Sequence, residues 1–178
     1  MSNLITSKGN ITIRPAVPGD AAALRELRIE ALADRPEAFA ADHAAAVADS
    51  PQVWADMVMK NAWDNRGVIC VASTEDRLVG MTGLGRGHWP KTRHSGTIWG
   101  VYVSPDWRGL QIVDGLMNEC IAWARAQGIT IVKLGVVTTN TSAIRFYARY
   151  GFTVYGIEPR AISYNGVFYD ELMMAKSI

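Results

Sequence analysis

The sequence is poor in the residues that disulfide frameworks and metal sites require. It holds only two cysteines, Cys70 and Cys120, and three histidines among its 178 residues. Neither an HExxH motif nor a close cysteine pair occurs, so the ligand spacings typical of zinc sites are missing. The two cysteines lie far apart, in segments patterned as a strand and a helix interior. We therefore expect two buried, reduced thiols, as is usual in the cytoplasm, and no bound metal.

The sequence also lacks long apolar runs and any excess of one charge. Its 18 Lys and Arg residues nearly balance 17 Asp and Glu residues, which leaves a net charge of +1. Nucleic-acid-binding domains usually carry a basic stripe, and a membrane-spanning helix needs about 20 apolar residues in a row. The first residues do not have the basic and apolar segments of a signal peptide. The expected location is the cytoplasm, with no nucleic-acid partner and no membrane partner.

Apolar residues are plentiful enough for one core. They make up 49% of the chain, and this length typically forms one domain, here 1–178, without help from disulfides or metals. Periodicity and turn residues predict the order β-α-α-β-β-β-α-β-α-β-β. Strand–helix–strand pieces and a meander together indicate an α/β fold, with a mixed sheet and helices on both faces. The predicted segments are 11–14, 21–33, 51–62, 67–72, 78–84, 96–103, 113–124, 129–137, 143–150, 152–157 and 167–175.

Four local expectations follow from the same reading. Asp20 stands where a helix N-cap belongs, so its side chain should accept hydrogen bonds from the next turn. The alanine-rich stretch 38–48 is expected to continue helical structure. Ala62 is expected on the apolar face of the second helix, and Gly115 should let its helix lie close to the sheet.

The segment 101–113 leads from a strand through a short loop directly into a helix. Such a turn directs backbone N–H groups and the positive end of a helix dipole toward one point, which suits a phosphate. Arg108 adds a cation, and Gly109 allows close approach of the backbone. Taken alone, these residues fit an ordinary strand-to-helix connection better. A nucleotide triphosphatase loop is excluded, because the Walker lysine is missing.

Two motifs and the order of the elements occur together in a known family. The motifs are Val103-x-Pro105-x-x-Arg108-Gly109 and Asn140-x-x-Ala143-x-x-Phe146-Tyr147-x-x-x-Gly151-Phe152. From 11 to 173 the chain resembles the GNAT superfamily of N-acetyltransferases. The resemblance implies an acyl-CoA N-acyltransferase fold, whose central mixed sheet is splayed between the strands near Val101 and Val136. It also implies an enzyme that moves an acetyl group from acetyl-CoA to a primary amine, by direct attack in a ternary complex.

The resemblance assigns the acyl donor to particular residues. The backbone amides of Val101, Tyr102 and Val103 would hold the pantetheine arm and can polarise the thioester carbonyl, as an oxyanion hole does. Asn140 would hydrogen-bond the same arm. The pyrophosphate would lie against Arg108, Gly109, Leu110, Gln111, Ile112 and Val113.

Tyr147 would lie near the thioester sulfur and act as the catalytic acid. A phenol of pKa about 10 can share a proton with a departing thiolate of pKa about 8.5. The position of Tyr147 on an amphipathic helix also fits a core aromatic residue. The motif places the catalytic role ahead of that alternative.

The turn departs from the family pattern Arg/Gln-x-x-Gly-x-Gly/Ala at its two small positions. Here they are Gln111 and Val113. Gln111 keeps its backbone N–H and adds a side-chain amide, whereas Val113 heads the apolar stripe of the helix and is expected to turn into the core. Acetyl-CoA binding is still expected, with weaker binding as the alternative. A non-catalytic acyl-CoA-binding or sensor module with this fold is the second class of function.

No general base is assigned. Relatives are expected to use a carboxylate on the strand equivalent to 96–103, and this strand has none. The candidates elsewhere are His88, His94, Asp170 and Glu171, for each of which a surface or structural role explains the residue better. A water chain or an already neutral amine would also serve.

The acceptor is expected to be a small amine, with peptide or protein N-termini as other acceptors. Its pocket should lie between the first two helices, the loop 86–95 and the last hairpin. Aromatic side chains can hold a cationic or apolar amine, and the candidate walls are Trp54, Trp89, Trp99, Tyr164 and Tyr169. The last strands offer an edge for a homodimer.

Overall fold

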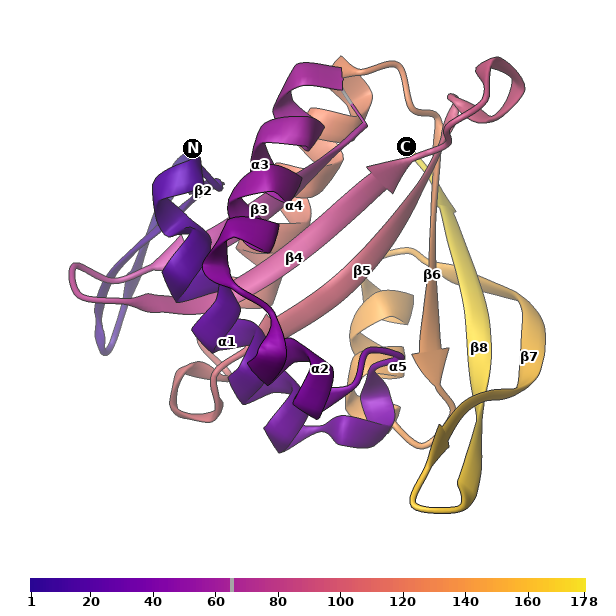
Figure 1. Ribbon diagram of the computed structural model, residues 1–178. Coiled ribbons are helices and arrows are strands. Elements are labelled where there is room, and N and C mark those ends of the chain that lie inside the picture. The colour runs from indigo at the N-terminus through magenta and orange to yellow at the C-terminus, as the bar shows by residue number, and fades with distance from the viewer. Residues whose placement is uncertain (65) are drawn as a thin grey trace.

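The computed structural model describes residues 1–64 and 66–178, and for 61–64 only the backbone. In these residues one mixed sheet of eight strands has the order β1-β2-β3-β4-β5-β6-β8-β7, and helices cover both faces (Figure 1). The strands are β1 (Ser2–Thr6), β2 (Gly9–Pro15), β3 (Gly67–Ser73), β4 (Leu78–Arg86), β5 (Ser95–Val103), β6 (Ile131–Val137), β7 (Thr153–Tyr164) and β8 (Val167–Ser177). The α-helices are α1 (Ala21–Asp34), α2 (His43–Ala48), α3 (Pro51–Asp64), α4 (Ile112–Ala126) and α5 (Thr141–Arg149). Short 3-10 helices are η1 (Pro18–Asp20), η2 (Pro36–Ala38), η3 (Pro90–Thr92) and η4 (Pro105–Trp107).

The predicted element order is confirmed, and the structure adds to it. β1 forms a hairpin with β2 and was not predicted, because its mostly exposed side chains leave no apolar alternation to detect. In the stretch 38–48 the only α-helix is the short α2, and Ala38 ends the 3-10 helix η2. β7 extends to Tyr164, well past its predicted end at 157. The expected place of Ala62 on a helix face lies outside the described side chains.

The sheet is splayed between β5 and β6, as the resemblance implied. β1 to β5 pair antiparallel, and β6, β8 and β7 form a second antiparallel group. The two groups meet only where 95–97 of β5 pair in parallel with 131–133 of β6. Beyond Thr97 the two strands diverge, which leaves the facing edge of β5 without a partner strand. The mixed α/β fold class is therefore confirmed.

Each face of the sheet has its own apolar core. On one face α4 buries its stripe, including Leu116 and Cys120, against β2, β3 and β4. A Cβ at Gly115 would lie 2.2 Å from Cδ1 of Ile13, so this glycine does let α4 approach the sheet. On the other face α1 and α3 pack against β3 and β4. Of the described helices, none has the length and apolar composition needed to cross a membrane.

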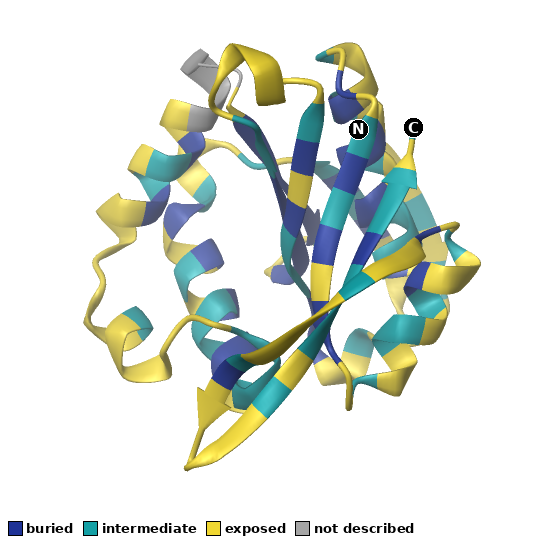
Figure 2. Cartoon of the chain, turned by 90° about the vertical axis from the view of Figure 1, so that its right-hand side faces the viewer, coloured by how far each residue is buried: buried dark blue, intermediate teal, exposed yellow. Residues whose placement is uncertain are grey.

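Burial is greatest in the middle of the sheet, whereas β7 is largely exposed and β8 is mostly half-buried (Figure 2). The two cysteines lie in the buried part as free thiols. The Sγ atoms of Cys70 and Cys120 are only 3.4 Å apart, between β3 and α4. A hydrogen bond with Cys120, together with burial, raises the pKa of the Cys70 thiol. The expectation of two buried thiols is confirmed, and the structure brings them into contact.

The prediction that Asp20 caps α1 with its side chain is wrong. The helix makes no side-chain cap bond there. The turn η1 comes first, and the Asp20 carboxylate turns back to accept bonds from Arg14 at 2.6 and 2.8 Å and from the Val17 N–H at 2.8 Å. The hydrogen bond from Arg14 lowers the pKa of Asp20 and raises that of Arg14. Asp20 therefore joins β2 to the start of α1.

Replacing Asp20 with asparagine should lower the free energy of unfolding at neutral pH by about 1 kcal/mol, since a two-bond Arg–carboxylate pair is lost at a partly exposed site. A folded-state pKa below the unfolded value of about 3.9 stabilises the protein above that pH, and the effect disappears as the pH falls through the folded-state pKa. Urea unfolding of both proteins at neutral and at acidic pH measures this. A stability difference that is the same in acid would show that the charge does not matter.

Candidate active site

The splay between β5 and β6 opens a groove of about 440 Å³. Its walls come from both strands, from α5 and from the segment around η2. It brings together most of the residues expected to bind the acyl donor, namely Val101, Tyr102, Val103, Arg108, Gly109, Val113, Asn140 and Tyr147. Sequence reasoning did not name Phe39, Gly100 or Ser142, which also line it. No periodic pattern marks Phe39, whereas the helical phase of α5 could have identified Ala143 and Phe146.

A bulge in β5 shapes the middle of the groove. Met81 of β4 pairs with Tyr102 and Gly83 pairs with Trp99, so the single residue between them faces two residues of β5, Gly100 and Val101. Gly100 has a φ of 63°, which glycine adopts without strain. Bulges redirect backbone groups away from the ladder. The β5 backbone can therefore offer hydrogen bonds to a ligand in the groove.

A second cavity, of about 600 Å³, adjoins the groove at the turn before α4. We call it the turn cavity. Gln111 and Ile112 line the turn cavity but not the groove. Leu110 lines neither of them, because its side chain packs against the core. The residues common to both cavities are Val103, Arg108, Gly109, Val113 and Phe146.

The turn cavity has the donors that an anion requires. Helix α4 begins without a side-chain cap, so its first N–H groups, which lack partners within the helix, stay available at the positive end of the dipole. Arg149 of α5 lines the cavity too, 3.4 Å from Asp114, and sequence reasoning missed this cation. These groups fit the pyrophosphate of an acyl-CoA.

Gln111 and Val113 occupy the turn in different ways. Gln111 has a φ of 60°, the left-handed conformation that favours glycine, so it holds the shape of a glycine turn at a cost of roughly 1–2 kcal/mol. Val113 does not turn fully into the core as expected. It is half-buried and lines both cavities, while its neighbour Ile112 is the residue that is buried.

Arg108 is held at the wall between the two cavities. Its Nε donates to the carbonyl of Val103 at 3.0 Å, and its Nη2 donates to Asp34 at the end of α1. Its guanidinium also lies 5.6 Å from the ring centre of Tyr102. Arg108 therefore ties α1 to the end of β5.

The position of Tyr147 fits both a core aromatic residue and a residue that faces the groove. Its ring is 7% exposed and packs edge-on against Phe146 and Phe152, as a core aromatic residue does. It also lines the groove, and no hydrogen bond within the described residues occupies its hydroxyl. Burial raises the pKa of Tyr147, so the phenol keeps its proton at neutral pH. A protonated phenol facing a groove is suited to donate that proton.

Asn140 uses only one end of its side-chain amide inside the protein. Its Oδ1 accepts from the Ala143 N–H at 3.2 Å and from Ser142 Oγ at 3.0 Å, which caps α5. The Nδ2 group makes no bond within the described residues. It is therefore free to donate to a ligand in the groove.

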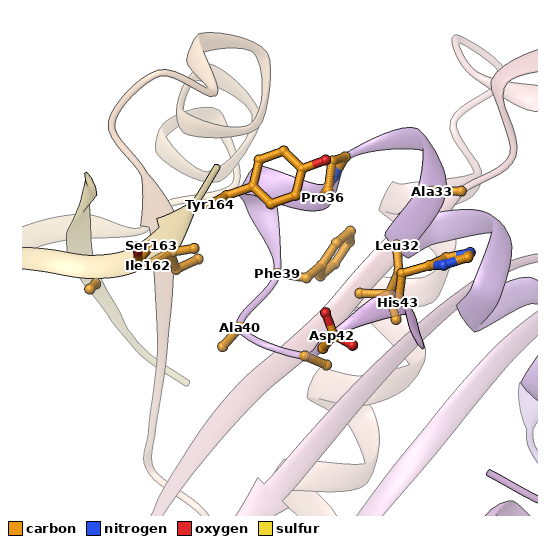
Figure 3. Close-up of a pocket in the computed structure, with 12 residues that line it drawn as sticks. Leu32, Ala33, Pro36, Phe39, Ala40, Asp42, His43, Ile162, Ser163 and Tyr164 are labelled. Carbon is orange, nitrogen blue, oxygen red and sulfur yellow. The ribbon is translucent and has the colours of Figure 1, made fainter. Parts of the chain in front are cut away.

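A third cavity, of about 400 Å³, lies beside Phe39, which lines the groove as well. It lies between the η2 region and the end of β7, and in Figure 3 Tyr164 extends from β7 toward Pro36, above Phe39. Arg28 of α1 lies nearby, with its guanidinium 4.7 Å from the centre of the Phe39 ring. Its Nη1 is buried and has no hydrogen-bond partner in the part of the chain that the structure describes, and burial lowers the pKa of this arginine.

The aromatic residues expected around an acceptor are only partly brought together. Trp99 lines the groove and Tyr164 the third cavity. Trp54 is instead buried in the core with α1, and Trp89 is 68% exposed. The loop 86–95 precedes β5 and lies at the end where β5 and β6 are paired, so it is remote from the groove. Tyr169 lies on β8 and lines none of the three cavities.

The candidates for a general base are also separated. His88 and His94 lie exposed on that remote loop. Asp170 accepts a hydrogen bond from the Arg160 N–H at 2.8 Å. Glu171 is half-buried on β8, beside the Gly135 wall of the groove.

Comparison with known proteins agrees with this geometry. Residues 29–152 match the acetyltransferase (GNAT) family. An uncharacterised N-acetyltransferase of Mycobacterium tuberculosis is 31% identical over 121 residues, which is 68% of this chain and 74% of that protein. An uncharacterised N-acetyltransferase of Methanocaldococcus jannaschii is 44% identical over 52 residues, so the match spans only 23% of its length. The L-amino acid N-acetyltransferase AaaT of Escherichia coli is 28% identical over 110 residues, 60% of this chain and 65% of AaaT.

Solved structures share the fold. A GNAT-family acetyltransferase of Streptococcus pneumoniae has a TM-score of 0.86 at 24% identity, covering 94% of this chain and 99% of that one. The yncA protein of Salmonella typhimurium, solved with its cofactor acetyl-CoA, has a TM-score of 0.83 at 22% identity over 95% and 94% of the two chains. The expected class, an N-acetyltransferase with acetyl-CoA as the acyl donor, is confirmed at the level of the family. This chain belongs to the acetyltransferase (GNAT) family.

Proposed function

We propose that this protein moves an acetyl group from acetyl-CoA to a small primary amine, by direct attack in a ternary complex. The observation that carries the proposal is the joined path from the uncapped start of α4, along the bulged edge of β5, to Tyr147. It supplies donors for a pyrophosphate, strand amides for a pantetheine arm and a phenol for the leaving thiolate. An extended acyl-CoA matches this sequence of groups.

Direct attack is favoured over a covalent enzyme intermediate. A covalent route needs an activated nucleophile in the groove. Cys70 and Cys120 are buried between β3 and α4 and do not line it. Their free state also supports the cytoplasm as the location.

The acceptor is best described as an amine that also carries a carboxylate. Burying a charged group without a partner is costly, and among the described residues the buried Nη1 of the half-buried Arg28 has no hydrogen-bond partner, while its guanidinium contacts the Phe39 ring. Its Nη1 lies 3.8 Å from the place that a Cβ on Gly100 would take, and Gly100 lines the groove, although Arg28 itself lines none of the three cavities. The relative AaaT is named for L-amino acids as substrates, which agrees with a carboxylate at this position.

One assay tests both parts of this proposal. We expect coenzyme A release with a panel of amines, and a lower KM for an amino acid than for the amine of the same skeleton without the carboxylate. Arg28→Met should abolish that preference. Thermal stabilisation by acetyl-CoA without turnover would favour a non-catalytic binding module, and the absence of stabilisation would contradict acyl-CoA binding altogether.

Replacing Gln111 with glycine should raise the free energy of unfolding by up to about 1 kcal/mol, because it removes the left-handed strain. It should also tighten acetyl-CoA binding, since bulk leaves the wall of the turn cavity. Gln111→Val is the matched contrast and should destabilise the protein, because a β-branched residue resists a positive φ. Thermal unfolding with and without acetyl-CoA measures both effects. Weaker binding by the glycine variant would show that the Gln111 side chain contacts the ligand.

A homodimer is also proposed, through the outer strand β7. This strand is one of the two edges of the sheet and exposes Val154, Tyr155 and Ile157, each more than half accessible. An unpaired apolar edge is suited to pairing with a second copy.

A further inference from the structure

The β5 wall of the groove has no carboxylate to accept a proton. The side chains that it contributes belong to Ile98, Trp99, Val101, Tyr102 and Val103. A primary amine of pKa about 10 arrives as an ammonium ion at neutral pH, and nitrogen cannot attack before a proton leaves. A base for the proposed reaction must therefore come from another wall.

Glu171 of β8 lies beside the opposite wall, next to the groove residue Gly135, although it does not itself line the groove. β8 pairs with β6 so that Glu171 stands opposite Val137. A Cβ at Gly135 would lie 2.4 Å from Oε2 of Glu171 and 3.0 Å from its Cδ. The carboxylate thus fills the space that a side chain at 135 would take. Because Gly135 lines the groove, the carboxylate lies directly against a residue of the groove wall.

This carboxylate is not committed to any other contact. No hydrogen bond or ion pair engages it within the described part of the chain. Glu158 of β7 is paired with it in register. Other charged groups on β8 and on the elements around it are Lys133, farther along β6, Asp170, which accepts from the Arg160 N–H of β7 at 2.8 Å, and Arg35 with Glu37 at η2, 3.9 Å apart. Burial, and then repulsion by Glu158, raise the pKa of Glu171, which increases its affinity for a proton.

We propose that Glu171 is the general base of the acetyl transfer, receiving the proton of the acceptor ammonium at the Gly135 wall. The assignment rests on the proposed function, in which an amine is the acceptor. It explains why a glycine faces the groove at 135, since any larger side chain would displace the carboxylate.

The proton and electron balance is complete with the groups named. The ammonium gives one proton to Glu171, and the freed nitrogen lone pair forms the C–N bond with the thioester carbon. The C–S bond then breaks with its electron pair on sulfur, which takes a proton from Tyr147. The new amide nitrogen loses its second proton, which restores Tyr147 through solvent. The proton on Glu171 leaves to solvent, so each turnover releases one proton.

The test is the pH dependence of kcat/KM for the wild type, Glu171→Gln and Glu158→Gln, with one amine at saturating acetyl-CoA. Glu171→Gln should lower kcat/KM at neutral pH by about 100-fold or more. The deficit should shrink as the pH approaches the pKa of the amine, because a neutral amine needs no base. Glu158→Gln is the matched control on the neighbouring strand. It should keep the plateau rate and move the acidic limb to lower pH, since one negative charge has gone.

Thermal stabilisation by acetyl-CoA should be equal in all three proteins, which verifies their folding. An unchanged rate in Glu171→Gln, or a deficit that is the same at every pH, would overturn the assignment. If Glu171→Gln does not fold, Glu171→Asp replaces it. The Glu171→Asp variant should have a lower kcat/KM than the wild type, and its pH profile should keep the acidic limb. A variant with the wild-type kcat/KM and no acidic limb would overturn the proposal. A wild type that acetylates no amine would instead refute the proposed function itself.

Discussion

Replacing Tyr147 with phenylalanine is expected to lower kcat by about 100-fold or more, since a positioned general acid contributes on this scale. The ring stays in place against Phe146 and Phe152, so folding and acetyl-CoA affinity should change little. Only the hydroxyl is lost, and among the described residues this group has no hydrogen-bond partner. Steady-state kinetics and the thermal shift with acetyl-CoA measure the two effects separately.

The pH dependence of kcat provides a second test of the role of Tyr147. Because burial raises the pKa of Tyr147 above its ordinary value of about 10, the phenol stays protonated throughout the neutral and mildly alkaline range. No alkaline loss of kcat in that range should come from this group. Tyr150→Phe is the matched control, since its hydroxyl donates to Asn118 at 2.5 Å, away from the groove. Equal rates for Tyr147→Phe and the control would remove Tyr147 from the mechanism.

Replacing Asn140 with aspartate should weaken acetyl-CoA binding by about 10-fold, the effect of roughly 1.4 kcal/mol, while the protein remains stable. Aspartate keeps the oxygen that caps α5 and adds a charge that helix N-termini favour. What disappears is the free Nδ2 donor facing the groove. Isothermal titration with acetyl-CoA measures the affinity.

Asn140→Ala separates the cap from the donor. It loses both, so it should bind acetyl-CoA weakly and also unfold with about 1 kcal/mol less free energy. If Asn140→Asp binds as tightly as the wild type while Asn140→Ala binds weakly, the side chain acts through the helix alone. The role that the resemblance implied for Asn140 would then be wrong.

Much of the architecture could be predicted from sequence because its signals are local. The stripe of α4 and the Asn165-Gly166 turn, for example, each specify an element through neighbouring residues. β1 was not predicted because its own side chains are mostly exposed and show no apolar alternation. Asp20 was misjudged because its partner Arg14 lies on the preceding strand, and the competition between a cap and an ion pair is decided in three dimensions.

In the candidate site, too, features set by neighbouring residues could be predicted, whereas those set by contacts between distant segments could not. The strand, the turn and the α5 motif predicted residues that the structure brings together around two adjoining cavities. The bulge at Gly100, the unpaired Arg28 and the carboxylate over Gly135 could not be predicted. Each depends on strands or helices that are distant in the sequence, and no spacing of residues records their contact.

The most direct test of acetyl transfer is mass spectrometry of a mixture of the protein, acetyl-CoA and an amino acid acceptor. We predict N-acetylated acceptor and free coenzyme A in equal amounts, with the protein itself unmodified. An acyl-CoA complex that persists with neither product, or an acetylated protein that precedes the product, would contradict direct transfer in a ternary complex.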